Sequence, residues 1–122
     1  MFCPRLWCSM RPDDLVRVRH MLDAAREARE FANGRQRTDL DNDRQLVLAV
    51  VKSIEIVGEA AARVSEETRA AHPAIPWAAA VGMRNRLVHA YFDIDHDRVW
   101  DTVTDELPPL IIQLSNLVGA GK

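Results

Sequence analysis

Apolar residues recur at three- and four-residue intervals along most of this chain, and that spacing limits its fold more than any other feature. The first such run predicts a helix that Asp13 or Asp14 can cap and that ends before Gly34. Because an apolar helix face must be buried against another element, packed helices are predicted. The apolar face of this first helix comprises Leu15, Val18, Leu22, Ala25, Ala28 and Ala32.

A second helix is predicted over residues 42–64, after a polar connection at residues 35–43. Gly58 lies inside it and costs roughly 1 kcal/mol relative to alanine, which is tolerable if a neighbouring helix approaches closely there. Ser65 can cap a short helical turn that stops at His72-Pro73.

Two more helices complete the pattern. Pro76 suits the first turn of a third helix, predicted over residues 76–91. Asp95 can cap a last helix over residues 96–117, in which Pro108-Pro109 predicts a kink or break. With no alternating strand pattern, the chain is predicted to be all-α: an antiparallel bundle of four main helices plus a short one.

The length of 122 residues suits one domain. The bundle is predicted over residues 11–118. Residues 1–10 lack helical patterning, and we interpret them as a tail or a start-site artefact, with Met10 as an alternative start. Residues 119–122 are predicted to form a C-terminal tail.

Composition excludes several classes of protein. The net charge of −2 disfavours a sequence-blind polyanion binder, although all but two of the 16 basic residues are arginine, whose planar fork suits phosphate. Cys3 and Cys8 support neither a disulfide scaffold nor a metal site. The longest apolar run, residues 46–51, is too short to span a membrane. A cytoplasmic protein without cofactor or metal is expected.

The segment 82–92 carries the candidate chemistry, because it combines Arg84, Asn85, His89 and Tyr91. Four residues apart on a helix, Asn85 and His89 would be surface neighbours. Histidine moves protons near neutral pH, and arginine can bind a phosphorane in bidentate form. This set suits metal-independent RNA cleavage by attack of the 2′-hydroxyl on the adjacent phosphate. One His per chain cannot easily be both base and acid, so a homodimer with a two-fold cleft is expected.

Arginine followed by a polar residue and, four residues after the arginine, by histidine resembles the signature of HEPN ribonucleases. The tyrosine two residues further on resembles the HepT toxin branch of that superfamily. Motifs in HepT order and spacing extend this resemblance from about residue 12 to 117: Gly58-Glu59-Ala60-Ala61, Ile75-Pro76-Trp77, Met83-Arg84-Asn85, Leu87-Val88-His89-Ala90-Tyr91-Phe92, Ile94-Asp95, Val99-Trp100 and Leu107-Pro108.

The resemblance implies an endoribonuclease toxin of a two-gene toxin–antitoxin module. Arg84, His89 and Asn85 would be its catalytic residues. The partner would be an MntA-like minimal nucleotidyltransferase that transfers AMP from ATP onto Tyr91. That modification would place a phosphate and a bulky base where substrate phosphate should bind.

Two further residues and two alternatives stay open at this point. Glu59 either points into the cleft or is an exposed helix residue, and Arg86 either adds a phosphate contact or is solvated. His20, His72 and His96 are interpreted as surface or capping residues. The main alternative function is a non-catalytic helical module that binds a nucleotidyltransferase. A helical DNA-binding domain is disfavoured by the acidic balance and by the lack of a basic recognition helix.

Overall fold

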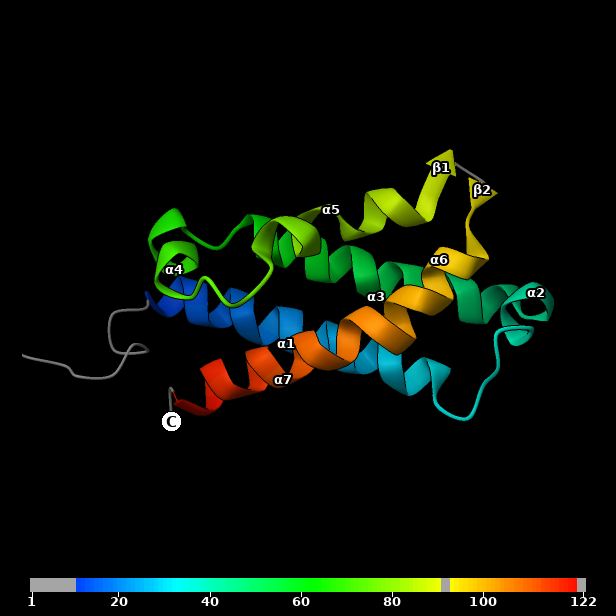
Figure 1. Ribbon diagram of the computed structural model, residues 1–122, viewed down its shortest axis with the longest axis horizontal. Coiled ribbons are helices and arrows are strands. Elements are labelled where there is room, and N and C mark those ends of the chain that lie inside the picture. The colour runs from blue at the N-terminus through cyan, green and yellow to red at the C-terminus, as the bar shows by residue number, and fades with distance from the viewer. Residues whose placement is uncertain (1–10, 91–92, 121–122) are drawn as a thin grey trace, which may run out of the picture.

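The computed structural model describes residues 11–90 and 93–120, and for His89, Ala90 and Ala120 it describes the backbone alone. The predicted all-α bundle is confirmed, with a short hairpin inserted between its helices (Figure 1). The elements in chain order are α1 (Pro12–Ala32), α2 (Asp39–Asn42), α3 (Arg44–Ala62), α4 (Glu66–Ala71), α5 (Trp77–Leu87), β1 (Val88–Ala90), β2 (Asp93–Ile94), α6 (His96–Asp101), the π-helical segment η2 (Thr102–Glu106) and α7 (Leu107–Ala120).

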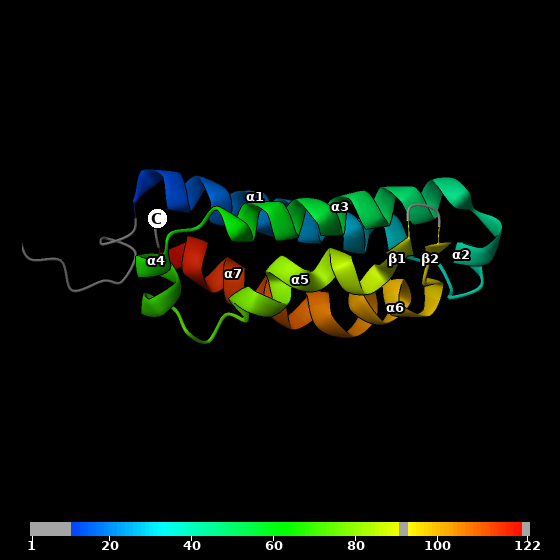
Figure 2. The same cartoon turned by 90° about the horizontal axis from the view of Figure 1, so that it is seen from above.

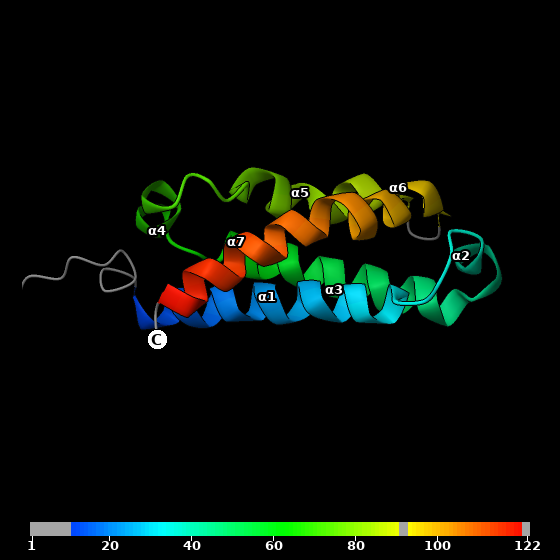
Figure 3. The ribbon, with the colours of Figure 1, turned by 60° about the horizontal axis from the view of Figure 1, so that its bottom comes forward.

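The main helices form two layers around one core. α1 and α3 make one layer, and α5 with the α6–α7 run makes the other (Figure 2). α3 packs against both α1 and α5, whereas α7 runs obliquely across α1 (Figure 3). Each fully buried Leu, Ile or Met in this core contributes about 1.5–3 kcal/mol. The largest of them are Met21, Ile54, Leu87, Leu107, Leu110 and Leu114.

Gly58 allows α3 and α5 to pack closely. A Cβ atom at this position would lie 3.1 Å from the carbonyl oxygen of Val81 and 3.2 Å from that of Ala80. Both contacts are with backbone atoms of α5, which cannot move aside as a side chain could. The sequence-based expectation of a close helix approach at Gly58 is therefore met, and it brings the first half of α5 against the C-terminal part of α3.

Asp14 corrects the predicted cap of the first helix. The N-cap of α1 is Arg11, and no side chain caps it. Instead Asp14 is buried and joins α1 to the start of α4. Its carboxylate accepts hydrogen bonds from Ser65 Oγ at 2.6 Å, Thr68 Oγ1 at 2.7 Å and the Ser65 backbone N–H at 3.0 Å. Ser65 caps α4 as predicted, through the N–H of Thr68.

The third helix is shorter than predicted. α5 ends at Leu87, and residues 88–90 form strand β1, which pairs antiparallel with β2. Val88 is extended and lies opposite Ile94, and the Asp95 N–H donates to the Leu87 carbonyl at 2.8 Å. β-Branched Val88 favours this conformation, and the pairing with β2 stabilises it. The prediction of helix over residues 88–90 is therefore wrong.

The last helix does not break at its prolines. Pro108 and Pro109 lack an N–H, so neither can donate to the preceding turn. The chain accommodates them by widening into η2, in which the Leu107 N–H donates to the Thr102 carbonyl five residues earlier. Of the expected kink or break, the helical run shows no break: it contains a π-helical segment, and α7 continues to Ala120, beyond the predicted end at residue 117.

Candidate active site

Arg84 and Asn85 are exposed on the last turns of α5 and line a cleft against α3. The cleft has a volume of about 210 Å³. Its α3 wall supplies Glu55 and Glu59, and Gly58, where α3 and α5 pack closely, also lines it. The structure thus brings three of the predicted residues (Arg84, Asn85 and Glu59) to one cleft.

Glu55 was not predicted from the sequence, yet it is the direct partner of Arg84. Its Oε2 lies 3.3 Å from Arg84 Nε, and its Oε1 lies 3.2 Å from Lys52 Nζ. Partial burial opposes ionisation of Glu55, but the hydrogen bond from Lys52 and the charges of Lys52 and Arg84 outweigh it, so the pKa of Glu55 lies below its ordinary value. Because Gly58 follows Glu55 by three residues, helical spacing could have placed both on this wall.

His89 follows the helix rather than lying on it. Its backbone is the middle residue of β1, and its side chain lies outside the described residues, as does the whole of Tyr91. Asn85 and His89 are therefore not neighbours on one helix, which corrects the geometry predicted from their four-residue spacing. What the structure does establish is that His89 lies two residues past the end of α5, in the hairpin next to Arg84 and Asn85.

Glu59 and Arg86, the two residues predicted to support the site, have different surroundings. Glu59 is exposed and lines both the Arg84 cleft and a smaller groove with Arg17, His20 and Arg63. Arg86 turns away from that cleft. It donates to the Ala79 carbonyl at 3.1 Å and pairs with Glu106 of η2 at 3.2 Å.

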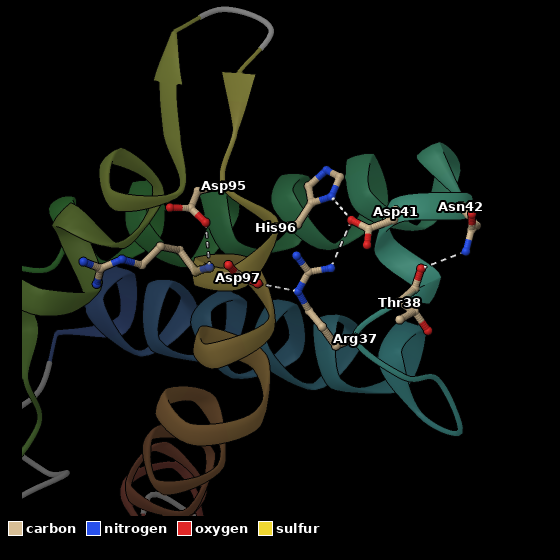
Figure 4. Close-up of polar contacts among 8 residues, drawn as sticks. Arg37, Thr38, Asp41, Asn42, Asp95, His96 and Asp97 are labelled. Atoms are coloured by element: carbon tan, nitrogen blue, oxygen red, sulfur yellow. Dashed lines mark hydrogen bonds and ion pairs between the residues drawn. The ribbon is translucent and has the colours of Figure 1, made fainter.

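A polar cluster fixes the segment that follows the hairpin (Figure 4). Arg37 Nε lies 2.7 Å from Asp97 Oδ1, and its Nη1 lies 3.1 Å from Asp41 Oδ1. The same Asp41 oxygen lies 2.9 Å from His96 Nδ1. Hydrogen bonds from His96 and Arg37 lower the pKa of Asp41. The loop before α2 and α2 itself are thereby tied to the start of α6, which is separated from β2 by Asp95 alone.

The remaining histidines have structural surroundings. His72 ends α4, and its carbonyl accepts from Trp77 Nε1 at 3.0 Å. Burial lowers the pKa of His72.

In the described part of the chain, no three His, Cys, Asp or Glu side chains cluster closely enough to hold a metal ion. No helix within residues 11–90 and 93–120 is both long and apolar enough to span a bilayer.

Comparison with known proteins assigns this helical bundle to a family. Residues 21–117 match the family described as HepT-like ribonucleases, so the chain belongs to that family.

Individual relatives agree with this assignment. A candidate RNase of Caldanaerobacter subterraneus subsp. tengcongensis is 33% identical over 101 residues, covering 83% of this chain and 90% of that protein. A candidate RNase of Methanocaldococcus jannaschii is 32% identical over 90 residues, covering 74% and 83%. The probable ribonuclease HepT of Thermococcus cleftensis is 38% identical over 68 residues, covering 56% and 62%. No solved structure matches the chain.

Proposed function

We propose that this chain is a metal-independent endoribonuclease toxin of the HEPN type. Membership of the HepT-like ribonuclease family is the observation that carries the proposal. Two features of the fold support it: Arg84 and Asn85 are exposed at one cleft, and the hairpin with His89 follows their helix directly. Arg84 and Asn85 offer donors for a phosphate, and His89 offers an imidazole, a group that can transfer protons.

The proposed reaction is attack of the ribose 2′-oxygen on the adjacent phosphorus. A base removes the 2′-hydroxyl proton as the O2′–P bond forms, and an acid protonates the 5′-oxygen as the P–O5′ bond breaks. The products are a 2′,3′-cyclic phosphate and a 5′-hydroxyl. Arg84 stabilises the negative charge on the phosphorane, and Asn85 orients a phosphate oxygen or the imidazole.

Two protomers supply the two proton-transfer groups. Each chain offers one histidine in this segment, so a homodimer that shares one cleft provides His89 as base from one protomer and as acid from its partner.

Silencing of the ribonuclease takes place at the same cleft. An MntA-like nucleotidyltransferase transfers AMP from ATP onto the Tyr91 hydroxyl oxygen: the O–Pα bond forms, pyrophosphate leaves with the electron pair of its broken bond to Pα, and the hydroxyl proton goes to solvent. The added phosphate competes for Arg84.

An RNA oligonucleotide and its all-deoxy counterpart test this function. The purified chain is expected to cut the RNA, leave cyclic-phosphate ends, and spare the DNA, because only ribose supplies the 2′-nucleophile. Cleavage of both strands, or RNA products that end in a 5′-phosphate, would contradict the mechanism. Failure of unmodified dimeric protein to cut any RNA would favour the non-catalytic module that binds a nucleotidyltransferase.

A further inference from the structure

A second cavity is lined by the C-terminal end of α1 and by the α6–η2 run, of which η2 contacts α1. Its volume of about 480 Å³ exceeds the 210 Å³ of the Arg84 cleft. α1 and α6–η2 form its walls, whereas the Arg84 cleft lies between α3 and α5. The lining side chains that can bind a ligand are Arg26, Arg29, Arg35, Asn33, Trp100 and Thr104.

Two of these arginines are held in place without being neutralised. Arg26 Nη2 donates to Ser115 Oγ on α7 at 3.1 Å, and Arg29 Nη1 donates to the Val103 carbonyl at 3.3 Å. Both acceptors are uncharged. Within the described residues neither guanidinium forms an ion pair with a carboxylate, in contrast to Arg84, which pairs with Glu55.

The prolines explain why the Val103 carbonyl is available to Arg29. In an α-helix the Val103 carbonyl would accept from the N–H of Leu107, but that N–H donates to the Thr102 carbonyl instead. In a π-helix it would accept from residue 108, which is a proline and has no N–H. A buried carbonyl without a partner is costly, so an arginine side chain takes the place of the missing helix donor. Pro108 therefore sets both the π-helical segment and the position of Arg29. π-Helical segments of this kind are frequent at functional sites.

Trp100 adds an aromatic surface to the same cavity. It is half-buried: it packs on the core and also lines the cavity. Nucleic-acid bases stack on such rings for about 1–3 kcal/mol each, while arginine forks bind phosphate oxygens.

The helix dipole accounts for only part of this arrangement. Cations near the C-terminus of α1 are favoured by the macrodipole whether or not a ligand binds. The dipole does not, however, explain an aromatic ring in the same wall or side chains anchored to two other elements.

Among the lining residues Glu30 is the one carboxylate, and Arg35 is paired with Asp43 at 3.3 Å. Arg26 and Arg29 are therefore the cations left for a ligand.

We propose that this cavity is a binding subsite for single-stranded RNA, separate from the Arg84 cleft, in which Arg26 and Arg29 bind backbone phosphate and Trp100 stacks on a base. The proposal rests on the proposed ribonuclease function, which supplies RNA as the ligand. The subsite holds the strand and takes no part in the chemical step.

A 2′-O-methyl RNA of about eight nucleotides, within the length range of single-strand sites, tests binding apart from cleavage because its 2′-oxygen cannot attack. The test variant combines Arg26→Gln with Arg29→Gln, since glutamine removes the charge and keeps a polar side chain with an N–H donor. The matched control combines Arg19→Gln with Arg44→Gln: it removes two charges as well, from exposed positions on α1 and α3 that do not line the cavity. Thermal unfolding of all three proteins checks that the fold is kept.

The double variant is expected to bind the labelled strand at least about tenfold more weakly than the control. Its salt dependence should also be shallower, by about 0.7 in log–log slope for each lost phosphate contact. Binding should quench tryptophan fluorescence in the wild type and fail to do so in Trp100→Phe. Affinity within about twofold of the control, or unchanged quenching in Trp100→Phe, would overturn the subsite. Displacement of the strand by ATP as readily as by unlabelled strand would overturn its assignment to RNA.

Cleavage kinetics separate this proposal from the function on which it rests. The double variant should raise KM for RNA and leave kcat unchanged, because the subsite binds substrate and transition state equally. Strand binding that depends on Arg26 and Arg29, in a protein that cuts no RNA, would refute the nuclease and keep the subsite. Cleavage with an unchanged KM in the double variant would refute the subsite and keep the nuclease.

Discussion

At the scale of single residues, Asp14 is the buried carboxylate whose loss should cost most. It accepts three hydrogen bonds that join α1 to α4, two of them from Ser65 and one from Thr68. Asp14→Ala should lower the free energy of unfolding by about 2–3 kcal/mol, because these donors lose a charged partner. Thermal unfolding should show a fall in Tm of about 10 °C or more. Asp13→Ala, at the exposed neighbouring position, should change stability by less than about 0.5 kcal/mol.

The same carboxylate predicts acid sensitivity. Burial opposes ionisation of Asp14, but hydrogen bonds from Ser65 and Thr68 outweigh it, so its pKa in the folded state lies below the ordinary value. A depressed pKa gives stability that is complete above the unfolded-state pKa and is lost as pH falls through the folded-state pKa. Wild-type protein should therefore lose more stability on acidification below about pH 4 than Asp14→Ala does. Parallel losses in the two proteins would contradict this assignment.

Glu55 should compete with RNA for Arg84. Since the two side chains form an ion pair at 3.3 Å, a phosphate must displace the carboxylate to reach the guanidinium. Glu55→Gln should tighten RNA binding by about two- to fivefold, the strength of a partly exposed ion pair. Arg84→Gln should instead lower kcat/KM by about 100-fold or more. Weaker RNA binding by Glu55→Gln would show that Glu55 positions Arg84 for substrate.

Sequence reasoning reached some of the site at this scale and missed the rest for definite reasons. Arg84 and Asn85 could be placed together from the motif, because they are adjacent on one helix. Whether Glu59 shares their cleft stayed open, because that depends on the packing of α3 against α5. Glu55 was not predicted, because it lies four residues before Glu59 on a helix face that carries several charges. Such a position resembles an ordinary solvated one. The roles of Arg84, Asn85, His89 and Tyr91 remain predictions.

At the scale of elements, the contact between α3 and α5 decides where Arg84 lies. Gly58→Val should push α5 away, because its Cβ would meet the Val81 carbonyl oxygen at 3.1 Å. A loss of about 1–3 kcal/mol in the free energy of unfolding is expected, with a fall in RNA cleavage. Gly82→Ala on α5 is the contrasting change: no atom lies within 4 Å of its Cβ, so helix propensity should raise stability by about 0.5–1 kcal/mol. Chemical denaturation of both variants checks the pair, and equal effects would contradict the close approach.

The ends of elements were harder to predict than their existence. Periodicity located α1 and α3 within a few residues, since their apolar faces are long. It could not reveal the end of α5 at Leu87, because Val88 fits either a helix or a strand until β2 pairs with it. The two prolines signalled a disturbance in the last helix. That they produce a π-helical segment rather than a break depends on packing of α7 against α1, a tertiary effect that local sequence does not contain.

At the scale of the whole molecule, the proposed cleft belongs to a homodimer. If base and acid are the two copies of His89, a mixed dimer of wild type with His89→Ala has one of them missing. Adding excess His89→Ala protein should therefore suppress wild-type cleavage after subunit exchange, whereas excess His20→Ala should not. Activity that merely tracks the amount of wild-type chain would indicate that each protomer cleaves alone. Sedimentation of the wild type gives the oligomeric state independently.

Cleavage of RNA by the purified wild-type chain in excess EDTA, compared with His89→Ala, tests the central claim most directly. The wild type should cut, and the variant should be slower by about 100- to 10,000-fold, the contribution of a general acid–base group. Cleavage that EDTA abolishes, or that His89→Ala retains, would contradict a metal-independent ribonuclease centred on His89.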